Sequence, residues 1–343
     1  MLLLCAFVEA THWSEVTPSG TAPTARKGHT AVWSEAADGM YIFGGNDGSN
    51  KNDLHFFNRQ ATHWSEVTFN GTAPTARDEH TAVWSEAADG MYIFGGWDGS
   101  SRFNDLHFFN RQTATWSEVT FNGTAPTQRK EHTAVWSEAA DGMYIFGGWD
   151  GSSRFNDLHF FNRQTATWSE VTPSGTAPWQ RKGHTAVWSE AADGMYIFGG
   201  IASSGFRNDL HFFNRQTATW SEVTPSGTAP TGRESHTAVW SEAADGMYIF
   251  GGWAGSYENA LHFFNRQASH WSEVTFSGTA PSGREAHTAV WTEAANGMYL
   301  FGGWTGSLLN DLHFINGEAT TTSATATTTS ATATTTSATA TTT

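Results

Sequence analysis

The stretch HTAVWSEAADGMYIFGG, residues 80–96, decides the fold because close copies of it recur through the chain. Its first five residues, HTAVW, occur six times at spacings of 51 or 52 residues. A period near 50 residues indicates an array of one supersecondary unit rather than a series of unrelated domains. The six copies begin at His29, His80, His132, His184, His236 and His287.

Each repeat predicts four short strands joined by turns. In the second copy these are residues 80–86, 91–96, 105–110 and 115–120, rich in aromatic and β-branched residues. The turn AADG after the first strand ends in glycine, for example Gly39, where we expect a positive φ. No part of the repeat has helical periodicity over ten residues. Stacking such units radially buries both faces of each, so we predict an all-β fold, a six-bladed β-propeller of four-stranded blades.

The repeats resemble the kelch-repeat family. Apolar residues lead into a double glycine at residues 91–96, and six residues separate the aromatic Phe109 from Trp116. An Arg-x-x-His pattern precedes the first strand, as at Arg129 and His132. The family more often has Tyr where Phe109 stands. The resemblance covers nearly the whole chain outside its C-terminal tail, with all copies in phase, and it implies a kelch-type propeller.

The last repeat is incomplete, and the missing piece stands at the other end of the chain. Residues 312–317 end without the fourth-strand sequence TWSEVT, whereas residues 11–17 read THWSEVT. We therefore predict that the N-terminal strand completes the last blade and closes the ring, with Trp13 in the position that Trp116 occupies in its own blade. Such closure removes the free ends of the array.

The chain divides into three parts: a surplus N-terminal segment at 1–10, the propeller at 11–317 and a Thr/Ser/Ala-rich tail at 318–343. The first segment is short and β-prone; it adds to an exposed edge, stays disordered or is a degenerate signal peptide. The tail has no apolar face and resembles the O-glycosylated stalks of secreted proteins. Together with two Asn-x-Thr sequons it favours an extracellular or cell-surface glycoprotein, the alternative being an unmodified linker in a cytoplasmic protein. The glycosylation candidates are Asn70, Asn122, Thr320, Thr321, Thr322, Ser323, Thr327, Thr328, Thr329, Ser330, Thr334, Thr335, Thr336 and Ser337.

Two loops differ between the copies, while the other turns are nearly constant. One variable loop lies between proline and the first-strand histidine, and the other follows the double glycine. In an up-and-down blade these two loops lie on the same face, so we expect that face to bind a ligand. Its aromatic and arginine residues are of the types enriched at binding hot spots, although each tryptophan could instead pack between blades. The candidate binding residues are Trp97, Arg102, Phe103, Trp149, Arg154, Phe155, Trp179, Phe206, Arg207, Trp253, Tyr257 and Trp304.

The composition limits the partners. A formal net charge of −15 argues against nucleic-acid binding and against attraction to anionic membranes. No apolar run is long enough to span a membrane. The repeat accounts for all 15 histidines, and protonating all of them would bring the net charge from −15 to 0. We therefore expect more self-association near pH 5 to 6, which light scattering would detect.

Catalysis and cofactor binding have little support in the sequence. Six first-strand histidines from different blades are expected to lie too far apart to share a metal, so no metal or cofactor is predicted. Some kelch-like propellers are enzymes, including a copper oxidase that needs a cysteine linked to a tyrosine, but Cys5 lies outside the repeat motifs. No group of catalytic residues stands out from the repeated background.

The sequence therefore predicts a non-catalytic interaction scaffold whose variable loops bind a protein or glycan partner. The alternative is a secreted, glycosylated structural subunit that self-assembles into a polymer through its N-terminal strand and tail. Replacing Trp97, Arg102 and Phe103 with alanine is expected to weaken partner binding and to leave the melting temperature nearly unchanged.

Overall fold

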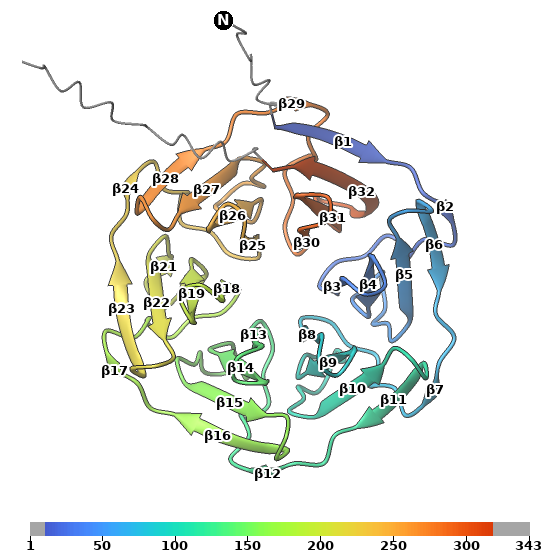
Figure 1. Cartoon of the computed structure of the whole chain (residues 1–343), viewed down its shortest axis with the longest axis horizontal. Coiled ribbons are helices and arrows are strands. Elements are labelled where there is room, and N and C mark those ends of the chain that lie inside the picture. Colours follow the sequence, from blue (N-terminus) through green and yellow to red (C-terminus); the bar gives the residue numbers. More distant parts are fainter. Residues whose placement is uncertain (1–10, 318–343) are drawn as a thin grey trace, which may run out of the picture.

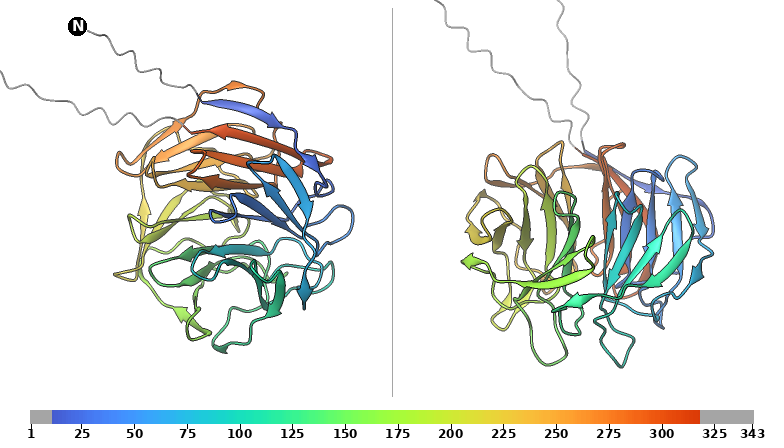
Figure 2. Two further views of the ribbon diagram at one scale, coloured as in Figure 1. Left: turned by 45° about the vertical axis from the view of Figure 1, so that its right-hand side comes forward. Right: turned by 60° about the horizontal axis from the view of Figure 1, so that its bottom comes forward.

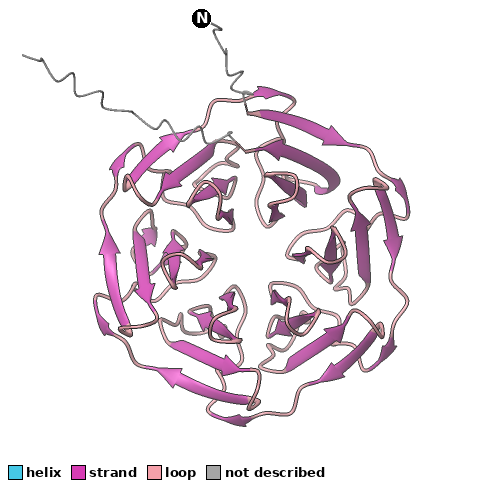
Figure 3. Ribbon diagram, in the orientation of Figure 1, coloured by secondary structure: helices cyan, strands magenta, loops and turns pink. Residues whose placement is uncertain are grey.

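The computed structural model describes residues 11–317, and the predicted N-terminal segment and tail lie outside these residues. The described chain forms a closed ring of six blades around a central channel (Figure 1). Strands and loops build every blade (Figure 3), and residues 11–317 contain no helix long and apolar enough to cross a membrane. The predicted all-β, six-bladed propeller is confirmed.

In blades 1 to 5 the inner four strands follow one another along the chain, from the channel outward, and a short fifth strand lies on the rim. Blade 1 contains β2 (Ser19–Gly20), β3 (Thr30–Ser34), β4 (Gly39–Phe43), β5 (Leu54–Asn58) and β6 (His63–Glu66). Blade 2 contains β7 (Asn70–Gly71), β8 (Thr81–Ser85), β9 (Gly90–Phe94), β10 (Leu106–Asn110) and β11 (Thr115–Glu118). Blade 3 contains β12 (Asn122–Gly123), β13 (Thr133–Ser137), β14 (Gly142–Phe146), β15 (Leu158–Asn162) and β16 (Thr167–Val171).

Blades 4 and 5 follow the same plan, and blade 4 adds a small hairpin. Blade 4 contains β17 (Ser174–Gly175), β18 (Thr185–Ser189), β19 (Gly194–Phe198), β22 (Leu210–Asn214) and β23 (Thr219–Val223), and its hairpin is β20 (Ile201–Ala202) with β21 (Gly205–Phe206). Blade 5 contains β24 (Ser226–Gly227), β25 (Thr237–Ser241), β26 (Gly246–Phe250), β27 (Leu261–Asn265) and β28 (His270–Glu273).

Blade 6 combines the two ends of the described chain. It contains β29 (Ser277–Gly278), β30 (Thr288–Thr292), β31 (Gly297–Trp304), β32 (Leu308–Asn316) and β1 (His12–Val16). Strand β1 pairs antiparallel with β32, with Trp13 opposite Ile315 (Figure 1). Trp13 is fully buried, and its ring centre lies 5.4 Å from that of Phe250 in blade 5. The N-terminal strand thus holds the place in the last sheet that its sequence predicts.

The fifth strand of each sheet is a difference from the predicted four-stranded blade. In blade 2 it is β7, whose Asn70 and Gly71 pair in parallel with Thr115 and Trp116 of β11. Gly71 has a φ of 81°, and a Cβ there would lie 2.0 Å from the Trp116 carbonyl oxygen. Only glycine allows the linking loop to approach so closely, and a two-residue strand is too short to show alternation in the sequence.

A second difference concerns the turn between the first two strands of each blade. The positive φ of this turn belongs to Asp38, at 47°, and not to Gly39. Gly39 is the first residue of β4, and a Cβ there would lie 2.3 Å from the Phe57 carbonyl oxygen. The glycine is therefore needed for space between strands, while Asp38 tolerates the left-handed conformation as aspartate often does in turns.

The hydrophobic core lies between neighbouring blades, which stand face to face around the channel in the turned views of Figure 2. One core cluster joins Val32, Tyr41 and Phe43 of blade 1 to Trp84 and Phe109 of blade 2. Tyr41 stacks on Trp84 with ring centres 5.5 Å apart and planes 9° apart. The same stack recurs at every junction and ends with Tyr299 on Trp33, at 5.8 Å. Each blade thus depends on both neighbours.

Candidate binding face

The two variable loops of each blade lie together at one end of the channel, and we call this end the variable face. In blade 2 the amide of Asp78 donates to the Trp97 carbonyl, and the amide of Trp97 donates to the Asp78 carbonyl, each at 3.0 Å. The amide of Arg77 donates to the Lys51 carbonyl in the loop of blade 1. The loops are therefore joined both within a blade and between blades, on a single face as predicted.

A closed circle of backbone hydrogen bonds surrounds the mouth of the channel at this face. The residue before each first-strand histidine donates its N–H to the carbonyl of its counterpart in the preceding blade, at 2.8 to 3.0 Å. All six residues have positive φ, including glutamate, serine and alanine, whose φ values are 52° to 55°. The circle holds these residues in a conformation that costs non-glycine residues free energy. The residues are Gly28, Glu79, Glu131, Gly183, Ser235 and Ala286.

The side chains at the mouth leave acidic groups without partners. Lys130 binds Glu79, and Lys182 binds Glu131 with Nζ to Oε2 at 2.6 Å. Asp78 is 6% exposed and lines the mouth, and its Oδ1 has no hydrogen-bond partner within the described residues. Burial and the nearby Glu79 carboxylate raise the pKa of Asp78 to about 7.

Two more acidic side chains, from blades 5 and 6, line the same mouth. The Oε2 atom of Glu234 is buried and has no hydrogen-bond partner in residues 11–317. Burial raises the pKa of Glu234, and it also raises the pKa of Glu285. Because burying an unpaired carboxylate is unfavourable, the mouth would gain free energy from a cation or hydrogen-bond donor placed among Asp78, Glu234 and Glu285.

Three of the five tryptophans predicted to bind a ligand, Trp97, Trp149 and Trp304, are half-buried under neighbouring cations. Nζ of Lys130 lies 4.4 Å from the ring centre of Trp97, and the Arg102 guanidinium lies 4.9 Å from that of Trp149 in the next blade. Lys27 lies 4.9 Å from the ring centre of Trp304. These contacts join blades, which is the packing alternative considered for each tryptophan, although each of the three residues remains partly exposed.

The other predicted residues differ in exposure. The ring centre of Phe103 lies 4.2 Å from the guanidinium carbon of Arg77. The ring centre of Phe155 lies 4.4 Å from the guanidinium carbon of Arg129. Four further candidates are half-buried: Arg154, Arg207, Trp253 and Tyr257. The ring centres of Trp253 and Tyr257 lie 4.8 Å apart. Trp179 and Phe206, by contrast, are 70% and 37% exposed, and they are the large hydrophobic side chains that stand exposed within residues 11–317.

A buried arginine beneath the variable face was not among the candidates. Arg77 has no exposed surface, and its guanidinium forms two 2.7 Å hydrogen bonds with the Asp105 carboxylate. It also donates to the Gly95 carbonyl, and Asp105 in turn contacts Nε2 of His107 at 2.9 Å. The signal in the sequence is the pairing of Arg-x-x-His with the Asp before LHF, which recurs in five of the six repeats. This set ties the two variable loops of one blade together.

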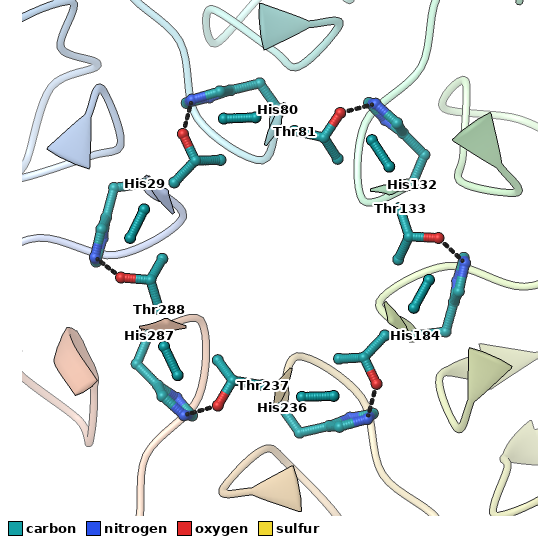
Figure 4. Close-up of a pocket in the computed structure, with 18 residues that line it drawn as sticks. His29, His80, Thr81, His132, Thr133, His184, His236, Thr237, His287 and Thr288 are labelled. Carbon is teal, nitrogen blue, oxygen red and sulfur yellow. Dashed lines mark hydrogen bonds between the residues drawn. The ribbon is translucent and has the colours of Figure 1, made fainter. Parts of the chain in front are cut away.

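The first-strand histidines form an inner ring around the channel (Figure 4). Nε2 of each histidine is hydrogen-bonded to a threonine hydroxyl of the preceding blade, for example His132 to Thr81 at 2.8 Å. The last bond, from Thr288 to His29, closes the circle. Within residues 11–317 no cluster of histidine, cysteine or acidic side chains has the arrangement of a metal site. The imidazoles serve as links between blades.

Burial keeps these six histidines neutral, which corrects one expectation. Desolvation lowers the pKa of His29 and His184 to about 3 and lowers the pKa of the other four as well. These six histidines therefore stay uncharged near pH 5, so histidine protonation does not bring the net charge from −15 to 0 at that pH. The assumption that all 15 titrate together is wrong because six of them are linked inside the ring.

The two sequon asparagines lie at the rim, in the short outer strands β7 and β12. Asn70 and Asn122 are exposed in the structure. Their positions are compatible with glycosylation, which remains a prediction. The tail candidates at residues 320–337 and Cys5 lie outside the described residues.

Comparisons with known proteins agree with this architecture. The profile described as the KLHDC2/KLHL20/DRC7 Kelch-repeats domain matches residues 2–200, 111–295 and 240–343. A leucine-zipper-like transcriptional regulator 1 homolog from Drosophila melanogaster is 34% identical over 70% of this chain and 25% of its own length. Human host cell factor 2 is 32% identical over 70% of this chain and 32% of its own length. Acyl-CoA-binding domain-containing protein 4 from Arabidopsis thaliana is 28% identical over 91% of this chain and 48% of its own length. The chain thus spans between a quarter and a half of these relatives.

Proposed function

Because the chain belongs to the kelch-repeat family, we propose that it is a non-catalytic interaction scaffold whose variable face binds a protein partner. The observation that carries the proposal is the exposure of Trp179 and Phe206. Trp179 stands in the loop before the first strand of blade 4, and Phe206 stands in the hairpin that follows the double glycine of the same blade. Exposed aromatic side chains beside half-buried neighbours are typical of binding hot spots.

The mouth of the channel suggests the chemistry of the partner. Asp78, Glu234 and Glu285 are acidic side chains that form no ion pair within residues 11–317, on the face that also carries Trp179. A lysine or arginine side chain of the partner would supply the hydrogen bonds that the buried oxygens of Asp78 and Glu234 lack. We therefore expect a partner segment that combines a basic residue for the mouth with apolar residues for blade 4.

Selection from a random peptide library displayed on phage tests this function, because such a library samples many partner chemistries at once. The intact propeller should enrich peptides that combine lysine or arginine with apolar residues. Trp179→Ala should lower their affinity at least about tenfold, as expected for a hot spot worth ~1.4 kcal/mol or more. Gln267→Ala is the control, because Gln267 is exposed in a turn of blade 5 on the face opposite the variable face. Peptides that bind the two variants equally well would place the binding site elsewhere.

A glycan partner and a self-assembling secreted subunit remain predictions. The second depends on residues 1–10 and 318–343, which lie outside the described part of the chain. Intact mass spectrometry of native protein distinguishes the two states of the tail. Added hexose masses would favour the glycosylated subunit and an extracellular location, whereas an unmodified mass of 37.3 kDa would favour the unmodified scaffold.

A further inference from the structure

Five blades contain the same buried arginine below the variable face, paired with both oxygens of an aspartate carboxylate. In blade 1 every N–H of the Arg26 guanidinium has an acceptor: Thr24 supplies its carbonyl and hydroxyl, Gly44 its carbonyl and Asp53 both carboxylate oxygens. The carboxylate of Asp53 also contacts Nε2 of His55, at 3.1 Å. A buried guanidinium is tolerated in this way because a bidentate carboxylate neutralises it.

Blade 5 lacks the carboxylate. Ala260 occupies the position that Asp53, Asp105, Asp157, Asp209 and Asp311 occupy in the other blades. Arg233 is nevertheless 1% exposed, like its counterparts, and it keeps its bonds to the Thr231 carbonyl and hydroxyl and to the Gly251 carbonyl. One N–H on each terminal nitrogen, the pair that binds aspartate elsewhere, has no acceptor in the described residues.

The histidine next to this position has also lost its partner. His262 is 5% exposed and corresponds to His55, but no carboxylate in residues 11–317 lies within ion-pair distance of its ring. The loss of one carboxylate therefore leaves two nitrogen-bearing side chains without a shared acceptor. Burial lowers the pKa of Arg233 and that of His262, which agrees with positive groups that lack a counter-ion.

The vacant position can be reached from solvent. In the other five blades the aspartate side chain is 13% to 26% exposed, and Ala260 itself is partly exposed. Glu258, at the position of Phe103 in blade 2, is the acidic residue of the chain whose charge acts on Arg233. Its Oε1 accepts a hydrogen bond from Ser256 at 3.1 Å, and it makes no ion pair with Arg233.

We propose that blade 5 carries a carboxylate-binding site, in which Arg233 and His262 hold a carboxylate from outside the chain in the place left vacant by Ala260. Two guanidinium N–H groups bind its oxygens side by side, as they bind aspartate in five blades, and Nε2 of His262 contacts one of the same oxygens. The ligand is a small carboxylate or the acidic side chain of a bound protein. The site stands on blade 5 alone and does not rest on the proposed protein-binding function.

Chemical rescue by acetate tests the site, with sodium chloride at the same ionic strength as the reference. Acetate should raise the melting temperature of the unmodified protein by roughly 2–4 °C at a concentration near ten times its Kd. Ala260→Asp supplies the carboxylate covalently, so this variant should melt at a higher temperature than the parent and should gain nothing from acetate. Line broadening of carbon-13 acetate signals in NMR gives a direct measure of binding, lost in Ala260→Asp.

Blade 2 provides the reverse experiment. Asp105→Ala creates the same vacancy beside Arg77 and His107, so acetate should raise its melting temperature as well. If that variant does not fold, Asp157→Ala replaces it, since it creates the same vacancy beside Arg129 and His159 in blade 3. An acetate shift of equal size in the parent and in Ala260→Asp would overturn the proposal.

Glu258 provides the remaining discriminating variant. If its carboxylate turns onto Arg233 in solution, the parent will not respond to acetate, whereas Glu258→Gln will respond and will melt at a lower temperature. That result would also overturn the proposal, since the site would then be filled from within the chain. A response of both proteins to acetate supports the vacant site. An acidic partner peptide that competes with acetate would identify a protein side chain as the ligand source.

Discussion

The two faces of the ring are built at opposite ends of the same strands, yet only one of them varies. At the opposite face a half-buried arginine binds an aspartate in the same way in five blades, for example Arg111 with Asp89 at 2.6 Å. Main-chain contacts there also repeat: the amide of Glu35 donates to the Glu86 carboxylate, and the next four junctions have the same bond. The arginine–aspartate pair joins two turns of one blade, and the glutamate bond joins two blades, so these repeated side chains are engaged in contacts of the scaffold.

At the variable face the backbone itself closes the circle, which leaves the side chains available. The amide of Glu79 donates to the Gly28 carbonyl whatever side chain the residue carries. Beneath the loops, buried arginines and aspartates supply the remaining support. A repeat protein can therefore vary the side chains of one face when main-chain bonds and buried ion pairs hold that face together.

Removal of residues 1–17 should have the largest effect on stability, because it opens the ring on which both faces depend. The deletion takes β1 from blade 6, together with Trp13, which is fully buried against blade 5. We expect loss of the cooperative melting transition in circular dichroism. Deletion of residues 1–10 alone is the control and should leave the transition in place. Equal melting of the two deletions would show that the ring does not need β1.

Alanine substitution of two tryptophans in different surroundings should give the next largest difference in the free energy of unfolding. Trp116 is 1% exposed in the outer strand of blade 2, whereas Trp179 is 70% exposed on the variable face. Trp116→Ala should lower the free energy of unfolding by about 3–5 kcal/mol. Trp179→Ala should change it by less than ~0.5 kcal/mol. Urea unfolding followed by circular dichroism measures both, and a large loss in Trp179→Ala would assign that residue to packing.

The ion pairs of blade 3 compare the two faces directly. Asp157 binds Arg129, which has no exposed surface, whereas Asp141 binds Arg163, whose side chain is 30% exposed. Asp157→Asn leaves a buried cation without its partner and should cost about 3–5 kcal/mol. Asp141→Asn removes a pair near the surface and should cost about 1 kcal/mol or less. If urea unfolding gave equal losses, the buried pair would not support the variable face.

The pH dependence of stability should reveal the histidine ring. Burial lowers the pKa of His184 to about 3 from 6.5. The unfolded chain therefore takes up a proton below pH 6.5 that the folded chain does not, so this histidine costs stability as the pH falls from 6.5 toward 3. Between pH 7 and pH 5 one such histidine costs about 2 kcal/mol.

The variant His184→Gln isolates this effect from the carboxyl groups of the mouth. The raised pKa of Asp78 acts in the opposite direction between pH 7 and pH 4, because the folded chain then binds the additional proton. The destabilisation caused by His184→Gln should therefore shrink by about 2 kcal/mol from pH 7 to pH 5, since the variant lacks the titrating group. Urea unfolding at several pH values measures it, and a constant difference would contradict the buried neutral state.

The sequence predicts much of this architecture because the repeat makes its pattern visible six times over. The blade, the missing strand at residues 11–17 and the common face of the variable loops all follow from comparing copies. The exposure of individual side chains does not follow. Trp97 is half-buried because Lys130 of the next blade lies over its ring, whereas Trp179 has no such cover, and only the fold brings such residues together.

The smallest expected effect concerns Arg102, whose side chain joins the variable loops of blades 2 and 3. Its guanidinium lies 4.9 Å from the ring centre of Trp149, and a Cβ on Gly151 would collide with it. Arg102→Ala should cost about 0.5–1 kcal/mol, the usual worth of a partly exposed cation–π contact. Ser101→Ala, at the exposed neighbouring residue, is the control and should change stability by less than ~0.5 kcal/mol. A loss in Arg102→Ala as large as that of Trp116→Ala would show that the variable loops form part of the core, and the two faces would then differ in sequence but not in mechanical role.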